Sequence, residues 1–281
     1  MKVYLILVRK FFGILSLVAP KLAAQIAFNL FQKPQTKLVR PLEQSFIDNA
    51  TKFKIYGQHE PIQCYELGPK QGSIVVLVHG WESNVGSMAA IATSLAHQGF
   101  RVIGFDLPAH GFSKQSKANL VTCKKALLSV LGYFRYSGVP SIISHSFGSI
   151  VTAYSLANSD ISVKKIVMLT TPDKVLDIFN DFKGIIGLND SAYRNLLIRA
   201  QKLIDENLEL VSVQRLAPKI RYSSLGLIHD QFDKVIPYNN SLNVYANTKN
   251  AKLTTFEKIG HYRMLWNKDV IAAIESDLLV A

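Results

Sequence analysis

Short apolar runs alternate with longer helix-like stretches along most of this 281-residue chain, and this alternation limits the folds open to it. The strand-like runs lie at about residues 52–57, 61–67, 74–79, 101–105, 140–145, 164–170, 222–228 and 251–257. The helix-like stretches lie at about 85–98, 118–136, 147–158, 238–246 and 264–279. Strands that alternate with helices form βαβ units, so the sequence predicts an α/β fold with a doubly wound, mostly parallel sheet of about eight strands. The first two runs are expected to form an antiparallel hairpin joined by residues 57–61.

The spacing of these elements also predicts how the chain divides. Hydrophobic residues make up 48% of the sequence and charged residues 19%, which is ample for one large domain with a full core. We expect that core to consist of residues 51–172 and 218–281, after a basic, helical N-terminal leader over residues 1–50. Residues 173–217 separate two predicted strands by more than an ordinary connection, and they are expected to form a small helical cap.

The strongest chemical signal is Ser-His-Ser-Phe-Gly at residues 144–148. It follows a strand-like run and precedes a helix-like one, so Ser146 is expected at the apex of a tight strand-to-helix turn. Such a turn lifts a serine hydroxyl clear of its neighbours, and a histidine that takes the proton makes the hydroxyl a nucleophile. The pattern is G-x-S-x-G with Ser144 in place of the first glycine. Taken alone, the pentapeptide fits a structural serine equally well, so the rest of the chain must supply a base and an acid.

The base and the acid are expected later in the chain, each in a loop after a strand. His261 follows Gly260, which allows a sharp turn, and precedes a helix-like stretch. Asp230 and Asp233 both lie in the loop after the predicted strand at 222–228, and a carboxylate there can orient the histidine. The residues themselves leave both aspartates open as the acid.

An oxyanion hole needs two backbone N–H groups aimed at the charge that develops on the substrate. One is expected from Phe147, the residue after the candidate nucleophile. The other is expected from Trp81, in the loop after the predicted strand at 74–79, where Gly80 lets the backbone approach a substrate. His79 and His110 are expected to be structural, with His79 bracing this loop.

These motifs together resemble the α/β-hydrolase superfamily of serine hydrolases. The matching segments cover the chain from about residue 52 to its C-terminus and lie at 79–81, 106–113, 144–148, 233–237 and 260–261. The resemblance implies a catalytic triad in the order Ser146, Asp233 and His261, since Asp-x-x-Ile-Pro resembles the acid loop of the superfamily. Asp230 is then expected to brace its loop. Asp106 would shape another loop and do no chemistry.

Two residues depart from the superfamily pattern. Ser144 replaces the first glycine of the turn, and Ser149 stands where Gly or Ala is usual. Both are small, as close packing of strand and helix requires, so we expect them to be tolerated with slight crowding. The nucleophile position holds Ser rather than Asp, which argues against the dehalogenase and epoxide-hydrolase branches.

Several classes of protein are disfavoured by what the sequence lacks. Cys64 and Cys123 provide neither a disulfide framework nor a Cys/His metal cluster. The glycine-rich nucleotide motifs are absent, so neither a metal nor an organic cofactor is expected. The net charge is +12, but no nucleic-acid-binding motif accompanies it, so no nucleic-acid partner is expected. We expect a cytoplasmic protein, with a peripheral-membrane or an exported protein as alternatives.

The leader concentrates the positive charge. Residues 1–54 contain nine Lys/Arg and two acidic residues, a net charge of +7, and the remaining 227 residues carry +5. The longest charge-free runs, 11–20 and 22–32, are shorter than the roughly 20 apolar residues that span a bilayer. A signal peptide is disfavoured because an apolar segment at 3–8 occupies the place of its polar start. Two interpretations stay open: helices packed on the body of the protein, which we favour, and contact of residues 1–35 with a membrane surface.

The expected function is that of a serine hydrolase, carboxylesterase-like, which cleaves a small-molecule acyl ester or thioester through an acyl-enzyme intermediate. The alternatives are a membrane-surface lipid hydrolase and a non-catalytic ligand-binding protein that keeps the fold. Five apolar residues of the predicted cap would either line an acyl pocket or bury the cap against the core: Phe179, Phe182, Ile185, Ile186 and Leu188.

Overall fold

The computed structural model describes residues 2–35, 39–56 and 60–279. Part of the predicted hairpin turn, residues 57–59, lies outside the described residues. The chain divides into two compact units. The larger contains Pro34–Asp173 and Val213–Ala281, and the smaller contains Met1–Lys33 and Lys174–Ser212.

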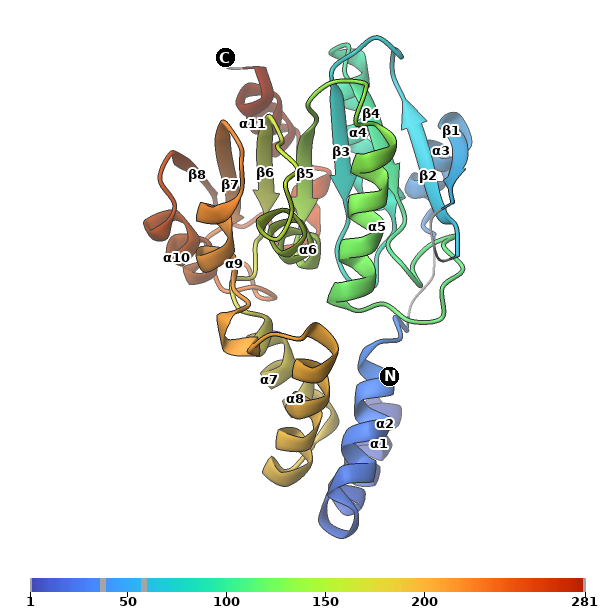
Figure 1. The fold of residues 1–281 in the computed structure, drawn as a ribbon, viewed down its shortest axis with the longest axis vertical. Coiled ribbons are helices and arrows are strands. Elements are labelled where there is room, and N and C mark those ends of the chain that lie inside the picture. Colours follow the sequence, from blue (N-terminus) through green and yellow to red (C-terminus); the bar gives the residue numbers. More distant parts are fainter. Residues whose placement is uncertain (1, 36–38, 57–59, 280–281) are drawn as a thin grey trace. The chain divides into compact units, whose positions relative to one another are not determined.

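The larger unit is built on a sheet of eight strands in the order β1-β2-β4-β3-β5-β6-β7-β8, counted over the described residues (Figure 1). The strands are β1 Thr51–Ile55, β2 Ile62–Leu67, β3 Ile74–Val78, β4 Arg101–Phe105, β5 Ser141–His145, β6 Lys165–Leu169, β7 Ser224–Asp230 and β8 Ala251–Phe256. The pairs β1–β2 and β2–β4 are antiparallel, and the other pairs are parallel. The predicted fold, a mostly parallel sheet of about eight strands with an antiparallel edge, is therefore confirmed.

Helices cover both faces of this sheet (Figure 1). They are α3 Pro41–Asn49, η1 Val85–Met88, α4 Ala89–His97, α5 Leu120–Tyr133, α6 Phe147–Ala157, α9 Val213–Leu216, η3 Ala217–Lys219, α10 Asn239–Asn247, η4 Arg263–Leu265 and α11 Lys268–Leu279. On one face, α3, α4 and α11 share a single core with the strands, to which Phe46, Ile91 and Ile274 contribute. The central strand β3 is buried along its whole length, which is why it reads as an unbroken apolar run.

The parallel strands bring loops that are distant in sequence to one edge of the sheet. The segments that follow β3, β5, β7 and β8 carry Trp81, Ser146, Asp233 and His261 respectively. In open α/β sheets, ligands bind outside the carboxyl ends of the strands. The topology therefore places the predicted site residues where such a site is expected.

The smaller unit is helical. It contains α1 Lys2–Val18, α2 Pro20–Phe31, α7 Val175–Ile186, α8 Asp190–Ile204 and the short η2 Leu208–Leu210. Helix α2 packs along α8, and α1 packs against α2 and α7. Small side chains at this contact let the helix backbones approach closely. The buried alanines are Ala23, Ala24 and Ala27 on α2 and Ala192 and Ala200 on α8.

Aromatic stacking joins the predicted leader to the predicted cap. The Phe31 ring lies 4.5 Å from the Phe179 ring and 5.0 Å from the Phe182 ring, centroid to centroid. The Asn189 side-chain amide donates to the Ser16 carbonyl at 2.9 Å. Two of the five apolar cap residues thus pack on the leader, and residues 1–33 and 174–212 form one helical unit. Among the described residues, no helix is both long enough and apolar enough to cross a membrane.

Candidate active site

Ser146 lies at a sharp turn between strand β5 and helix α6. Its backbone has φ 52° and ψ −123°, and few residues other than glycine adopt a positive φ. The Ser146 N–H donates to the Leu169 carbonyl at the end of β6 (2.9 Å), which anchors the turn to the neighbouring strand. Strained backbone of this kind often occurs at functional sites, and at a strand-to-helix turn it presents a serine hydroxyl to the substrate.

The turn depends on a very close approach of α6 to β3. A Cβ added to Gly148 would lie 2.4 Å from the Val78 carbonyl oxygen and 2.6 Å from the His79 carbonyl oxygen, so only glycine fits. The two serines that depart from the superfamily pattern meet beside this contact. Ser144 Oγ donates to Ser149 Oγ at 3.3 Å, and both side chains are fully buried. The two hydroxyls therefore satisfy each other where smaller residues are usual.

Three predicted residues come together at the carboxyl edge of the sheet. Ser146 Oγ lies 3.1 Å from His261 Nε2, and His261 Nδ1 lies 2.7 Å from Asp233 Oδ2. An ionised carboxylate only accepts hydrogen bonds, so Nδ1 carries the ring hydrogen and Nε2 keeps its lone pair. The serine hydroxyl donates to that lone pair. The geometry can therefore support proton transfer from Ser146 to His261.

The surroundings of Asp233 keep its carboxyl group ionised. Its Oδ1 accepts hydrogen bonds from the N–H groups of Val235 (2.7 Å) and Ile236 (3.1 Å). Burial alone would raise the pKa of Asp233, but the nearby His229 ring, the hydrogen bond from His261, the charge of His261 and the Val235 amide outweigh it. The pKa of Asp233 therefore lies below its ordinary value, and the anion is available to orient His261.

Asp230 accepts its hydrogen bonds from backbone N–H groups rather than from the His261 ring. Its Oδ1 accepts from the N–H groups of Phe232 (2.8 Å) and Lys258 (3.1 Å), and its Oδ2 accepts from the Gly260 N–H. Gly260 has φ +83°, a conformation that favours glycine, and directly precedes His261. Asp230 thus ties the loop after β7 to the loop that carries the candidate base.

Two further histidines contact the candidate triad, and sequence reasoning gave neither a role. His145 Nε2 donates to the His261 carbonyl at 3.2 Å. Burial and the charge of His261 lower the pKa of His145 to about 3, so its ring is neutral. His229 Nε2 lies 3.6 Å from Asp233 Oδ2 and donates to the Ile236 carbonyl at 3.1 Å. The available signal was a histidine at or next to the end of a strand that leads into each motif.

The two candidate oxyanion residues lie next to Ser146. The rings of Trp81 and Phe147 pack edge to face with centroids 5.4 Å apart. Phe147 begins α6, so its N–H is one of those that a helix start leaves without an intrahelical acceptor. A Cβ added to Gly80 would lie 3.2 Å from His145 Nδ1 and 3.3 Å from Ser146 Cβ, which shows how closely the Trp81 loop passes the serine.

His79 and His110 support that loop. His79 Nδ1 donates to the Gly80 carbonyl at 2.7 Å, and His79 Nε2 accepts from the Leu107 N–H at 3.0 Å. Burial and the charge of His110 hold the pKa of His79 well below its ordinary value, so the ring is neutral, as this pair of bonds requires. The His110 ring packs against the Trp81 ring with centroids 5.0 Å apart.

Asp106 shapes the neighbouring loop after β4. Its carboxylate accepts hydrogen bonds from the N–H groups of Val85 (3.0 Å) and Phe112 (2.9 Å) and from the Tyr65 hydroxyl (3.1 Å). A Cβ added to Gly111, which has φ +46°, would lie 2.4 Å from the Asp106 carboxyl carbon. Burial raises the pKa of Asp106 to about 6 despite these bonds.

Comparison with known proteins supports this fold. A family model described as the alpha/beta hydrolase fold matches residues 73–207. The chain has the α/β-hydrolase fold. A relative of this α/β hydrolase is the "Serine hydrolase-like protein" of Danio rerio, 28% identical over 134 residues, which are 44% of this chain and 39% of that protein. The match therefore spans less than half of that relative's length.

Solved structures match the α/β hydrolase over more of its length. A membrane phospholipase A, described as a novel bacterial virulence factor, is 16% identical with a TM-score of 0.65, and the match covers 99% of this chain and 98% of that one. An esterase of Pyrococcus furiosus is 16% identical with a TM-score of 0.64, covering 88% of this chain and 96% of that one. At this level of identity the likeness shows the fold.

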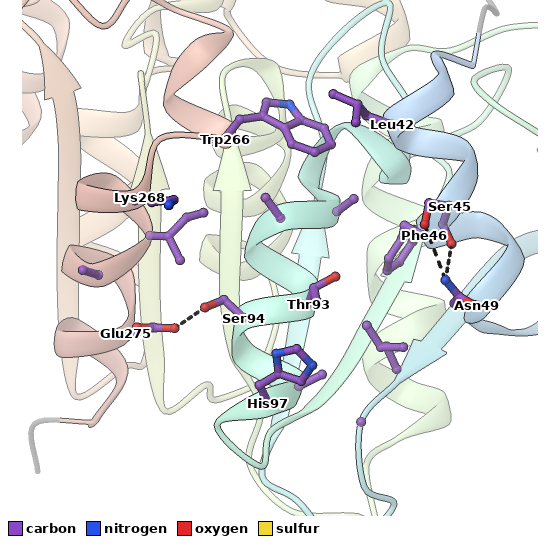
Figure 2. A pocket seen from close by; sticks show the side chains of 17 residues that line it. Leu42, Ser45, Phe46, Asn49, Thr93, Ser94, His97, Trp266, Lys268 and Glu275 are labelled. Carbon is purple, nitrogen blue, oxygen red and sulfur yellow. Dashed lines mark hydrogen bonds between the residues drawn. The ribbon is translucent and has the colours of Figure 1, made fainter.

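A groove of about 850 Å³ lies elsewhere on the larger unit of this α/β hydrolase, between α3, α4 and α11 (Figure 2). Leu42, Phe46 and Trp266 are among its lining residues, and Ser94 on α4 donates a hydrogen bond to Glu275 on α11. None of its lining residues belongs to the candidate triad. Among the described residues, no cluster of three or more His, Cys, Asp and Glu side chains could hold a metal ion.

Proposed function

We propose that this α/β hydrolase is a serine hydrolase that cleaves a carboxylic ester or a thioester through an acyl-enzyme intermediate. The proposal is carried by the hydrogen-bonded arrangement of three side chains. Ser146 Oγ lies 3.1 Å from His261 Nε2, and His261 Nδ1 lies 2.7 Å from Asp233 Oδ2. The family match supports hydrolase activity. The phospholipase A and the esterase of similar fold bear names of ester-cleaving enzymes, which favours this class of substrate.

In the proposed reaction, Ser146 Oγ attacks the acyl carbon while its proton passes to His261 Nε2. The tetrahedral intermediate collapses, the bond to the alcohol or thiol breaks, and the leaving group takes the proton from His261. A water molecule then attacks the acyl-enzyme, giving its proton to His261 and its hydroxyl to the acyl carbon. The proton returns to Ser146 Oγ when the carboxylic acid leaves, so the enzyme is regenerated.

The other residues serve the charges that develop in these steps. Asp233 fixes the tautomer of His261 and stabilises the imidazolium. Burial of this carboxylate strengthens its attraction to the charged ring. The backbone N–H groups of Phe147 and Trp81 are proposed to bind the oxyanion, each such donor being worth about 10²–10³ in kcat in enzymes of this type.

The decisive test is a covalent one. Wild-type protein is expected to react with a fluorophosphonate probe at Ser146 and to hydrolyse a short p-nitrophenyl ester. Ser146→Ala should lose both signals. Ser137→Ala, which removes an exposed hydroxyl outside the site, should keep both.

Two results would contradict the proposal. Unchanged turnover in Ser146→Ala would place the chemistry elsewhere. No turnover on a broad panel of esters and thioesters, together with ligand-induced stabilisation of the fold, would indicate a non-catalytic binding protein. Parallel assays of one acyl group carried as an ester and as a thioester would show which bond is preferred.

A further inference from the structure

Helix α1 exposes a continuous apolar stripe. Tyr4, Leu7, Phe11, Ile14 and Val18 follow one another at intervals of three and four residues, which places them on one side of the helix. Each of the five side chains is between 51% and 75% exposed. Exposed apolar surface of this extent on one element marks an interaction site rather than ordinary surface.

Helix α1 packs on its own unit through a different side from the one that carries the stripe. Phe12 and Ser16 are buried on the opposite side of the helix, and the Ser16 carbonyl accepts the hydrogen bond from Asn189, the residue that precedes α8. The helix is therefore apolar on two sides, one of which is occupied by its neighbours α2 and α7. Because the packed side already anchors α1, the stripe is free to serve a second contact.

The exposed surface extends from α1 onto the start of α2. Leu17 on α1 and Leu22 and Ile26 on α2 are also exposed. Lys10 borders the stripe, and Lys21 is exposed beside Leu22. We define the stripe together with these three apolar residues and two lysines as the α1 face.

The charged side chains of α1 and α2 themselves all have one sign. Residues 1–42 of the sequence contain seven Lys/Arg and no Asp or Glu. Arg9, Lys10 and Lys21 are exposed on α1 and α2. A second copy of this chain would bring the same positive charge to the contact, which disfavours self-association through this face. A partner that combines apolar depth with anionic groups at its surface fits both properties.

We propose that the α1 face docks on the surface of an anionic phospholipid bilayer. In this arrangement α1 lies in the plane of the membrane, its apolar stripe enters the acyl boundary, and the lysines reach the phosphate groups. At about 1.5 Å per residue, the 17 residues of α1 extend roughly 26 Å, less than the ~30 Å hydrocarbon core. The helix therefore lies on the bilayer and does not cross it.

The test measures binding of the full-length Ser146→Ala protein to vesicles, so it does not depend on turnover. Vesicles of phosphatidylcholine with a third of phosphatidylglycerol are compared with vesicles of phosphatidylcholine alone, by flotation at low and high salt. Binding is expected on the anionic vesicles, with at least a tenfold weaker partition on the neutral ones. Binding should also weaken at high salt, because exposed charges are screened over about 10 Å at 0.1 M.

Matched variants assign the binding to the stripe. Ile14→Gln and Ile198→Gln change the same residue type at exposures of 65% and 61%, the first on α1 and the second on α8. Ile14→Gln should weaken the partition several-fold, and Leu7→Gln/Phe11→Gln/Ile14→Gln at least tenfold, whereas Ile198→Gln should leave it unchanged. Far-ultraviolet circular dichroism confirms that each variant keeps its helices.

Three outcomes would overturn the proposal. The first is no binding to anionic vesicles at low salt. The second is equal loss of binding in Ile14→Gln and Ile198→Gln. The third is a wild-type dimer in lipid-free buffer that the triple variant dissociates in sedimentation, because a second copy would then be the occupant of the α1 face. If the wild-type protein bound anionic vesicles but hydrolysed no ester or thioester, the proposed function would be refuted and this inference would stand.

Discussion

Replacing Asp233 with Asn tests the proposed triad more sharply than removing the serine does. Asp233→Asn is nearly isosteric, and the Asn carbonyl oxygen can still accept from Val235 and Ile236. The position of Oδ2, 2.7 Å from His261 Nδ1, then holds an N–H donor. Two donors cannot face each other, so the His261 ring is expected to place its hydrogen on Nε2. In that tautomer the ring has no lone pair for the Ser146 hydroxyl.

The size of the loss follows from these contacts. Returning His261 to the productive tautomer forfeits a hydrogen bond to a charged acceptor, about 1.5–3 kcal/mol, and leaves a buried donor unpaired, about 1–3 kcal/mol. Their sum, roughly 2.5–6 kcal/mol, corresponds to about 10²–10⁴ in rate at 1.36 kcal/mol per tenfold. The same substitution in the Ser-His-Asp template enzyme lowers kcat about 10⁴-fold, so the upper end is expected.

The assay is kcat/KM for a short p-nitrophenyl ester, with thermal unfolding as the check on the fold. Asp181→Asn makes the same chemical change at an exposed aspartate on α7 and should keep the wild-type rate. If Asp233→Asn keeps more than a tenth of the wild-type kcat/KM while folded, Asp233 does not orient His261 and the proposed mechanism is wrong.

Three further predictions concern stability and positioning. Gly148→Ala should lower the free energy of unfolding by about 2–3 kcal/mol, because its Cβ would meet backbone oxygens. Gly132→Ala on α5, where a Cβ would enter open space, should raise the free energy of unfolding by about 0.5–1 kcal/mol. Urea titrations measure both changes. The folded pKa of Asp106, about 6, lies above its unfolded value of about 3.9, so its contribution to stability is full below pH ~4 and is lost as pH rises past 6. This loss of up to about 3 kcal/mol should be absent in Asp106→Asn when unfolding is measured across that range. His145→Phe removes the donor to the His261 carbonyl and should lower kcat about tenfold with little change in KM. His145→Gln keeps an N–H donor and should retain more of the wild-type kcat. An equal loss of kcat in both variants would argue against a positioning role for His145.

The strands of the sheet could be predicted from the sequence because each strand is a short apolar run between turn residues. Ser73–Val78 illustrates this: β3 occupies Ile74–Val78 and is wholly buried. The order of the site residues could also be predicted, since each follows a strand whose carboxyl end the topology brings to one edge. Local pattern and global fold agree in these segments, as they do in foldable sequences generally.

What could not be predicted depends on contacts between distant side chains. The leader was expected to pack on the body of the protein. Its third helix, α3, packs in the core of the larger unit, whereas α1 and α2 pack with α7 and α8 in the smaller unit. Nothing near Phe31 in the sequence indicates that its ring stacks on Phe179. Similarly, the bond from His145 to the His261 carbonyl joins residues 116 positions apart and depends on a rotamer that no local pattern reveals.

The packing of Phe31 against Phe179 and Phe182 has a consequence for how the protein is made. Helices α1 and α2 leave the ribosome before α8, along which α2 packs and which ends at Ile204. At about 5–20 residues per second, α2 waits roughly 10–35 s for that partner. During this interval the side of α1 and α2 that is later buried is exposed together with the outward stripe. The nascent chain therefore passes through a period in which both apolar sides of α1 are exposed, and chaperones or a nearby bilayer compete for them before α7 and α8 have been made.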